Sequence, residues 1–537
     1  MFDVTRAAGC SPYQVMEKQG VLIEQEEAEP RRAANEQALE RRPNLSPKIK
    51  PIQRDQAVWL ALDVENLVGP EHKIRAIWDL TGRMDLRELR EKIVSSQGEA
   101  GQAAEDPQLL ISIWIYAFSE GISSSRRVAD LLTHEPALMW VAGLRTMSHA
   151  TLANFRKDHQ AVLDKLFVQL LGMLETAGVV KLDQVMHDGT KIRAQAGVDT
   201  FRREGKLREN LEKARRVVEQ MGDPDAEETA RQRAARQRAR TERVERLEQA
   251  LAELQQLQAR QDSDEQKPEV RVSLTEPEAR MMKHGDNAIT PAYNAQISTD
   301  AEKKAIVGAH LSQCSSDSGS LLPALEVIRQ NLGRDPRQVV ADGGFTNRDT
   351  LAAMQEREID FIGSLGDPKA RQAAAMKAAG IDEKFAPAFF IFQPETNTLQ
   401  CPAGQQLAHV GQSGKRGNRY RQYRAEARDC QVCVHQPECC PKNPGKGRMV
   451  SRLVSEPPEV AEFRRKMETE EAKQVYRKRG PVAEFPNAWI KEKIGLRKFS
   501  LRGMVKAGME LTWACLSYNV MLWIRECWRS QAVAATA

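Results

Sequence analysis

The apolar positions between residues 55 and 178 repeat every three to four residues, which is the period of an α-helix. The pattern runs through LRELREKI, PQLLISIWIYAFSEG, SSSRRVADLLTHEPALMWVAG and HATLANFRKDHQAVLDKLFVQLLGMLETAG. Ser148 stands where an N-cap is expected before the last stretch, and Gly178 stands where that helix should stop. We therefore predict an all-helical domain over residues 55–178. A polar, charged and proline-containing segment, 1–54, precedes it and is expected to be poorly ordered.

After residue 178 the pattern changes to short β-branched runs. The stretch VVKLDQVMHDGTKI predicts a strand that ends at Asp188-Gly189, and AYNAQISTDAEKKAIVGAHLSQ predicts two strands around a turn that contains Asp300. The helix SLLPALEVIRQNLG, the strand RQVVADGGF, the helix NRDTLAAMQERE and the strand IDFIGSL follow. Antiparallel strands followed by strand–helix alternation predict a mixed sheet in an α/β domain, built from residues 179–199 and 271–395.

Residues 200–270 interrupt this α/β pattern with a helical one. One seam, with charges between its members, carries the apolar residues Val244, Leu247, Leu251, Leu254 and Leu257. Together with LRENLEKARRVVEQMG and the break MGDPDAEE, this seam predicts an antiparallel helical hairpin. Such an insertion could serve dimerisation or DNA contact. Without a specific signal for either, we favour an insertion that packs on itself.

The length and composition indicate a multidomain protein without membrane segments. A chain of 537 residues is expected to form two to four domains, and 41% hydrophobic residues are enough for their cores. The start, MFDVTRAAGC, lacks the basic and apolar regions of a secretion signal. The stretches LLISIWIYAF and LTWACLSYNVMLWI are too short to span a bilayer. We therefore expect a cytoplasmic protein.

The net charge of +5 is unevenly distributed. Residues 441–510 hold 17 Lys and Arg against 9 Asp and Glu. A local basic surplus indicates a polyanionic partner, and the alternative is an ordinary solvated helix face.

Five of the nine cysteines lie between residues 401 and 440, in a polar, loop-like setting that includes RDCQVCVHQPECCPK. In a reducing compartment such clustering favours metal binding over disulfides. We predict a small Cys-rich module, residues 396–445, with a closed structural Zn²⁺ site. Its predicted ligands are Cys401, Cys430, Cys433 and either Cys439 or Cys440, with His435 as a spare. The alternative is a set of thiols without a ligand.

Three acidic residues stand out. Asp188 and Asp342 each follow a β-branched run and precede a glycine, and Glu484 lies among Tyr, Arg and Lys in the basic helical region 446–537. Carboxylates are the ligands that Mg²⁺ prefers, and paired Mg²⁺ ions support phosphoryl transfer. If Asp188 and Asp342 end adjacent strands, they can face one point. Asp-Gly is also a common turn dipeptide, so either aspartate alone could mark a turn.

Other residues are weaker candidates. Glu492 and Glu510 are reserves for the third acid, although Glu510 fits a packed terminal helix better, and His187 fits a strand end better than a ligand position. In the helical domain, a group of serines and arginines at a helix start and two later basic residues could bind DNA phosphates. Alternatively, these residues could belong to a helical scaffold that makes no DNA contact. They are Ser123, Ser124, Ser125, Arg126, Arg127, Arg156 and Lys157.

Several motifs occur together in an order that carries a family resemblance. They are DGTKIRAQA at Asp188, EPEARMMKHGDN, AYNAQI, ADGGFTN at Asp342, and a C-terminal series followed by GLRKFSLRG and MELTWACLSYNVMLW. The C-terminal series is Tyr476, Arg479, Glu484 and Lys491. Over about residues 55–525 the chain resembles bacterial insertion-sequence transposases of the DDE class. It departs from them where Pro481 and Pro486 flank Glu484, since two prolines so close should break a regular helix.

The resemblance implies a ribonuclease-H-like catalytic core in which Asp188, Asp342 and Glu484 hold Mg²⁺ or Mn²⁺. It implies hydrolysis at the terminal inverted repeats of an element and joining of the 3′-ends to target DNA. The expected partners are double-stranded DNA and at least one further copy of the chain, in the bacterial nucleoid. The DNA-binding residues that it suggests are Tyr476, Arg479, Lys491, Arg497 and Lys498. The alternatives are a catalytically inactive DNA-binding regulator and a metal-dependent DNA nuclease.

Overall fold

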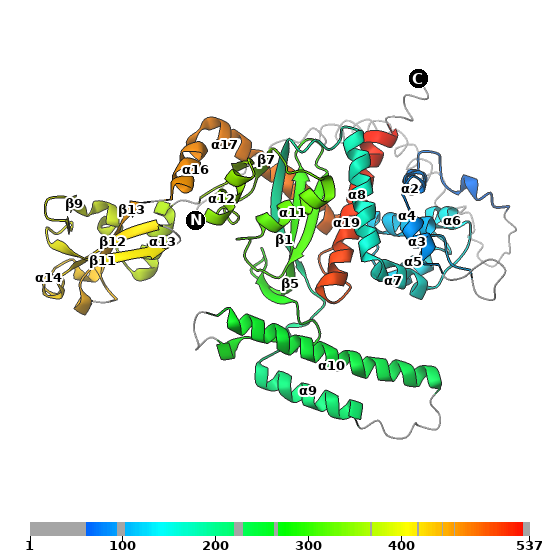
Figure 1. Ribbon diagram of the computed structural model, residues 1–537, viewed down its shortest axis with the longest axis horizontal. Helices are drawn as coiled ribbons and strands as arrows, with labels where there is room; N and C mark the ends of the chain where they lie inside the picture. The colour runs from blue at the N-terminus through cyan, green and yellow to red at the C-terminus, as the bar shows by residue number, and fades with distance from the viewer. Residues whose placement is uncertain are drawn as a thin grey trace, which may run out of the picture. The chain divides into compact units, whose positions relative to one another are not determined.

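The computed structural model describes residues 61–93, 103–219, 229–261, 267–365, 368–415, 418–442, 444–455 and 457–529. Its contacts divide the chain into the units Met1–Leu62 and Asp63–Ala537. The predicted poorly ordered segment, 1–54, lies outside the described residues. The helices and strands given below all belong to the second unit (Figure 1).

The N-terminal part of this unit is helical, as the apolar spacing predicted. After the short η1 (Glu65–Leu67) come α2 (Lys73–Gly82), α3 (Arg87–Glu91), α4 (Pro107–Ser119), α5 (Ser125–Leu131), α6 (Pro136–Ala142), α7 (His149–Asp158) and α8 (Gln160–Thr176). Ser148 is the N-cap of α7, where its side chain accepts a hydrogen bond from the Thr151 amide at 3.0 Å. Gly178 follows α8 with a φ of 71°, a conformation that favours glycine.

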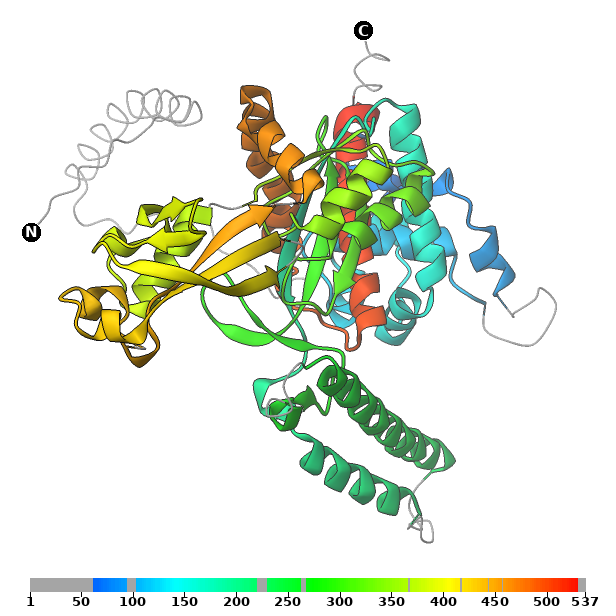
Figure 2. The same cartoon turned by 60° about the vertical axis from the view of Figure 1, so that its left-hand side comes forward.

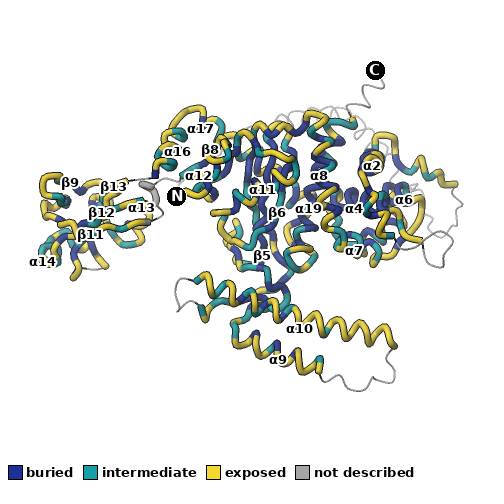
Figure 3. Tube along the Cα trace, in the orientation of Figure 1, coloured by how far each residue is buried: buried dark blue, intermediate teal, exposed yellow. Residues whose placement is uncertain are grey.

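Helix α4 lies at the centre of the helical part. Every residue from Leu109 to Phe118 is buried, and Figure 3 shows this helix in the colour of buried residues. A helix that is apolar on all sides must be surrounded by other elements. It packs against α2, α6 and α7, and against the C-terminal α19 (Met504–Trp523), so both ends of the second unit share one core.

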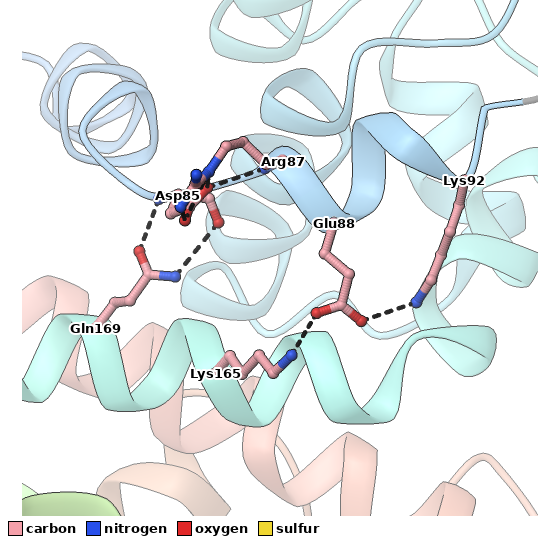
Figure 4. Close-up of polar contacts among 6 residues, drawn as sticks. All are labelled: Asp85, Arg87, Glu88, Lys92, Lys165 and Gln169. Atoms are coloured by element: carbon pink, nitrogen blue, oxygen red, sulfur yellow. Dashed lines mark hydrogen bonds and ion pairs between the residues drawn. The ribbon is translucent and has the colours of Figure 1, made fainter.

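Polar contacts hold the short α3 against α8 (Figure 4). The Gln169 side chain accepts from the Asp85 amide at 2.7 Å and donates to the Asp85 carbonyl at 3.3 Å. Glu88 accepts from Lys92 and from Lys165. Exposed ion pairs contribute little stability, so these contacts mainly fix where α3 lies.

A mixed sheet forms the α/β part. Its strands are β4 (Arg280–Lys283), β5 (Ile289–Asp300), β1 (Gln184–Arg193), β7 (Gln338–Val340) and β8 (Asp360–Ile362), in that order, with β6 (Ile306–Ser312) paired to β5. Strands β4, β5, β6 and β1 pair antiparallel, and β1, β7 and β8 pair parallel. This arrangement matches the predicted mixed sheet and is compatible with a ribonuclease-H-like core.

Helices connect and cover this sheet. Helix α11 (Leu321–Leu332) packs on β5 and β6, and α12 (Arg348–Glu356) joins β7 to β8. Helix α19 packs on β6, where the buried Asn519 side chain bonds both the amide and the carbonyl of Ile306, at 2.9 and 2.8 Å. The Asn519 side-chain amide therefore bonds the β6 backbone as a neighbouring strand would, and it connects the sheet to the helical part.

Two expectations about local structure were wrong. The strand predicted to end at Asp188-Gly189 continues to Arg193, because the antiparallel partner β5 pairs with it from Val185 to Arg193. The prolines do not break the helix around Glu484, since α18 runs from Arg479 to Glu492. Pro481 is its third residue, where an amide would have no partner within the helix, and Pro486 is accommodated in a buried position of the interior.

The remaining C-terminal helices are α16 (Pro458–Glu468), α17 (Glu470–Arg477) and the π-turn η7 (Ile524–Trp528). The pair α9 (Glu204–Glu219) and α10 (Ala230–Ala259) lie side by side in Figures 1 and 2. They share a small apolar cluster that includes Leu207, Leu211, Leu247 and Leu254. The short strands β2 (Phe201–Arg202) and β3 (Val272–Ser273), with η2 (Val198–Thr200) and η3 (Lys267–Glu269), flank the pair.

A second sheet surrounds the cysteines, and the sequence pattern did not indicate it. Its strands are β9 (Ile391–Gln393), β10 (Thr398–Gln400), β11 (Gln406–Lys415), β12 (Asn418–Ala425) and β13 (Met449–Ser455), each antiparallel to the next. The helices α13 (Pro368–Ala379), α14 (Ala427–Gln431) and α15 (Gln436–Cys439) accompany it, with the short turns η4 (Glu383–Phe385), η5 (Pro387–Phe389) and η6 (Pro444–Lys446). Many positions of these strands are only partly buried, which weakens the alternation that announces a strand.

Within the described ranges, no helix combines the length and the apolar character needed to cross a membrane.

Candidate active site

Of the two aspartates predicted as metal ligands, Asp188 lies on β1, and Asp342 lies just after the end of the neighbouring parallel strand β7. Met186 of β1 is paired with Val340 of β7, and Asp188 and Asp342 each lie two residues beyond this pair. Side chains two residues apart on a strand point to the same face. The ladder therefore carries both carboxylates to one place at the end of β7.

The negative charge of Asp342 affects the pKa of Asp188. The pKa of Asp188 is raised to about 6, first by burial of the carboxyl group and then by repulsion from Asp342. The guanidinium of Arg479 opposes this rise, as do hydrogen bonds from the Gly189 amide and the Asn487 side chain. A carboxyl group whose pKa is raised by burial and by a nearby carboxylate is a common feature of functional sites.

Helix α18 supplies the polar groups that face Asp188. Arg479 Nη1 lies 3.9 Å from Asp188 Oδ1, and Asn487 Nδ2 donates to Asp188 Oδ2 at 3.0 Å. Lys491 is one turn further along, and the charge of Asp188 partly offsets the lowering of its pKa by burial. The Tyr476 ring lies 5.9 Å from the Arg479 guanidinium. The structure thus brings Arg479 and Lys491 to Asp188, with Tyr476 next to Arg479.

Asn487 was missed by sequence reasoning. It is 7% exposed, and its Oδ1 has no hydrogen-bond partner among the described residues. The Nδ2 of the same amide donates to Asp188, so this oxygen lies next to the carboxylate. It is a hard oxygen without a partner within the described structure, of the kind that can bind a metal ion. The only sequence feature that could have indicated it is its position one turn before Lys491, within the C-terminal series of motif residues.

A buried polar network supports β1 from β5. His187 bonds Ser298 and Gln296, each at 2.9 Å, and Gln296 Nε2 donates to Asp317 Oδ1 at 3.2 Å. Burial lowers the pKa of His187 to about 4, so this histidine is neutral and structural. A Cβ on Gly189 would lie only 2.5 Å from Asp317 Oδ1. Gly189 therefore leaves room for these side chains to approach the strand closely, and it does not mark a turn.

Glu484 does not join the two aspartates. It lies on α18, one turn before Asn487, but its side chain is exposed and has no hydrogen-bond or ion-pair partner among the described residues. The reserve acids are also elsewhere. Glu492 pairs with Arg497 at the surface, and the buried Glu510 accepts hydrogen bonds from Ser500 and Leu501.

The two remaining predicted DNA contacts lie at the far end of β1. Arg497 and Lys498 are exposed, and the carbonyl of Arg497 accepts from the Arg193 amide at 3.2 Å. Of the weaker candidates, Arg156 is unavailable to phosphates. It is 5% exposed, its guanidinium lies 4.9 Å from the Trp114 ring, and it donates to the Ser123 carbonyl.

No group of three or more His, Cys, Asp or Glu side chains in the described part of the chain is arranged to hold a metal ion. The predicted zinc ligands are all described, so the structure gives the zinc prediction no support. The five cysteines and His435 do line one small cavity. Amides donate to two of the sulfurs, from Gln405 to Cys401 at 3.2 Å and from Arg448 to Cys430 at 3.4 Å.

Comparison with known families adds two matches. A family described as "Transposase domain (DUF772)" matches residues 62–158, which are the helices η1 to α7. A family described as "Transposase DDE domain" matches residues 400–522, which include α18 and the cysteines. No curated protein and no solved structure matches the chain. Together the two family matches indicate an insertion-sequence transposase of the DDE class.

Proposed function

We propose that this transposase cuts DNA at the ends of its own element and joins the 3′-ends to target DNA, with chemistry at Asp188 and Asp342. The observation that carries the proposal is that each aspartate lies two residues beyond Met186 or Val340, which pair with each other between the parallel strands β1 and β7. Basic and amide groups from α18 face the same point. Carboxylates flanked by cations suit a substrate whose phosphates must be held beside metal-binding oxygens.

The donor set suits Mg²⁺ or Mn²⁺ in its chemistry. Asp188 and Asp342 offer carboxylate oxygens, and Asn487 offers an unpaired amide oxygen, all of which are hard ligands. Such a cation would activate the attacking oxygen and stabilise the leaving one. We assign Asp188 and Asp342 as its ligands. Glu484 is proposed as the third by the family resemblance alone, since in this structure its exposed side chain on α18 lies apart from the two aspartates.

The side chains of this chain have separate tasks. Asp188 must lose its proton to bind a cation, so its pKa of about 6 allows binding at neutral pH and weakens it in acid. Arg479 and Lys491 bind phosphate oxygens, and Tyr476 packs against the DNA next to Arg479. Arg497 and Lys498 are exposed and contact the backbone further along the duplex.

The test is cleavage of labelled DNA that contains the sequences flanking the coding region, with Mg²⁺ or Mn²⁺ present. The expected products are cut ends and joined strands. Asp188→Asn should abolish both while DNA binding persists. Glu484→Gln should do the same if it is the third acid. A matched control is Glu492→Gln on the same helix, because Glu492 pairs with Arg497 at the surface, away from the two aspartates.

Other outcomes assign the alternatives. Binding without any cleavage by the unaltered protein would indicate a catalytically inactive regulator, and cleavage without joining would indicate a nuclease. The proposed assembly of at least two copies on two DNA ends is checked by light scattering of the DNA complex.

A further inference from the structure

The two halves of α10 present different side chains on the same face. In the C-terminal half this face packs on α9 through Leu247 and Leu254. Seven residues earlier, and again seven before that, the positions equivalent to Leu247 are Arg240 and Arg233. A second column changes in the same way, from Ala250 to Arg243. Residues seven apart lie on one side of a helix, so an apolar seam continues as an arginine face.

The charge along α10 changes at the same point. The first turns, residues 230–241, contain five arginines and no acidic residue. In α9, by contrast, cations are paired with carboxylates one turn away, as in Arg208–Glu204 and Arg216–Glu212. Arg215 of α9 reaches across to Glu248 of α10. Most of the charge on α9 is therefore balanced within the helical pair.

The cations of the arginine face are not balanced in this way. Arg233 and Arg243 are exposed and Arg240 is half-buried, and none of the three has a carboxylate partner in the described ranges. Figure 3 shows this end of α10 in the colour of exposed residues. Like charges one turn apart on a helix repel by a few tenths of a kcal/mol per pair. The arrangement therefore costs stability in the isolated protein, and an anionic partner would remove that cost.

We propose that the arginine face of α10, formed by Arg233, Arg240 and Arg243, binds the phosphate backbone of duplex DNA. Helical rise places the three guanidinium-bearing residues along about 15 Å of one helix face. Duplex DNA carries one negative charge for about every 1.7 Å of its axis, so several phosphates lie within that span. Arginine binds phosphate oxygens through paired N–H groups, and such contacts are independent of base sequence. The choice of DNA as the polyanion rests on the proposed function.

The test compares two triple variants of the full-length protein. One carries Arg233→Gln, Arg240→Gln and Arg243→Gln. The matched control carries Arg208→Gln, Arg215→Gln and Arg216→Gln, which removes the same charge from residues already paired with carboxylates. Binding to a labelled duplex of arbitrary sequence is measured by fluorescence anisotropy over a range of salt concentrations. EDTA is present, so cleavage plays no part.

The first variant should weaken binding at least about tenfold and lower the slope of log K against log salt by about 2 to 3. The control should change the affinity less than about twofold. A third variant, with Arg233→Lys, Arg240→Lys and Arg243→Lys, should keep most of the slope of the unaltered protein. Equal effects of the two variants would overturn the proposal.

Two further outcomes separate the alternatives. If the arginines serve carboxylates of this chain, the first variant will lower the melting temperature and leave the salt slope unchanged, which also overturns the proposal. Tighter binding of duplex RNA than of duplex DNA at the same face would overturn the choice of DNA. Asp188→Asn should bind the duplex like the unaltered protein, so a failure of the cleavage chemistry is distinguishable from a failure of the arginine face.

Discussion

The aspartate site gathers polar side chains from distant parts of the sequence, whereas the cysteine cluster comes from residues 401–440, and the electrostatics of the two also differ. Asp188 and Asp342 repel each other, yet Arg479 faces them and the pKa of Asp188 reaches only about 6. In the cysteine cluster, burial and the neighbouring thiols raise the pKa of Cys439 to about 12, and Arg448 opposes this only in part. At neutral pH Asp188 is therefore largely ionised, whereas the Cys439 thiol stays protonated.

This difference decides which site is ready for a metal ion. Metal ligands must be deprotonated, so the aspartates need no further change, whereas the thiols must lose protons as the metal binds. It also indicates different roles. The aspartates lie beside cations and an unpaired amide oxygen, while the clustered cysteines lie in loops and in the short helices α14 and α15, next to a small separate sheet with its own apolar cluster.

The largest effect is expected for catalysis. Asp342→Asn should reduce DNA cleavage by about 10³-fold or more, because it removes a ligand of the cation that the reaction needs. Cys433→Ser, in the cysteine cluster, should leave most of the cleavage rate in protein that remains folded. The rates are measured with saturating DNA. A loss of the same size in both variants would remove the distinction between the sites.

The second effect concerns thiol reactivity. The thiolate is the reactive form, so Cys439 should react with iodoacetamide at neutral pH about 10²-fold or more slowly than the exposed Cys314. Peptide mass spectrometry after timed labelling gives both rates, with denatured protein as the control for intrinsic reactivity. If EDTA accelerates labelling at Cys401, Cys430, Cys433 and Cys439 together, a bound metal protects them, and the description of neutral thiols is wrong.

The third effect concerns stability without metal. The folded-state pKa of Asp188, about 6, lies above its ordinary value near 3.9. The stabilising contribution of this group is present below pH 4 and is lost as the pH rises through 6, because the folded protein then holds an unfavourable charge. In EDTA at pH 7.5, Asp188→Asn should therefore raise the free energy of unfolding by about 1 to 2 kcal/mol.

This gain should shrink between pH 6 and pH 4, where the native aspartate becomes protonated. Thermal unfolding across this range gives the comparison. A variant that is less stable than the native protein at pH 7.5 would show that burial and the neighbouring charges do not disfavour the ionised Asp188 carboxylate. A variant made more stable but inactive fits a site where function costs stability.

The smallest effect is expected for Asn487→Ala. It removes one hydrogen bond to the Asp188 carboxylate and should raise the pKa of that group further. The expected cost is about 1 kcal/mol in cation affinity, or roughly five- to tenfold. Calorimetric titration with Mn²⁺ measures it. Ala488→Gly, at an exposed neighbouring position, controls for effects on the helix. An unchanged affinity would mean that Asn487 serves packing alone.

Much of the fold could be predicted from local pattern. The apolar period located the N-terminal helices, and the β-branched runs located β1, β5, β6, β7 and β8 in their observed order. The full length of β1 could not be predicted, because it is set by the partner strand β5 and by a glycine that admits Asp317. The second sheet was missed because many of its strand positions are only partly buried.

The candidate site divides in the same way. Asp188 and Asp342 could be found because each ends a buried run, and their meeting follows from the parallel pairing of β1 and β7. No sequence pattern marks Asn487, and its contact with Asp188 can be recognised only from the packing of α18 on β1. Pro481 and Pro486 misled because their cost depends on position in a helix, and the start of α18 was not evident from sequence.

The most direct test is the location of a bound cation. Crystals soaked in Mn²⁺ should show an anomalous difference peak in contact with carboxylate oxygens of both Asp188 and Asp342, at about 2.0 to 2.3 Å. A peak shared by these two aspartates, and lost in Asp188→Asn crystals, is the predicted result. Full Mn²⁺ occupancy at any other place, with none between the two aspartates, would contradict the assignment of this pair as the catalytic centre.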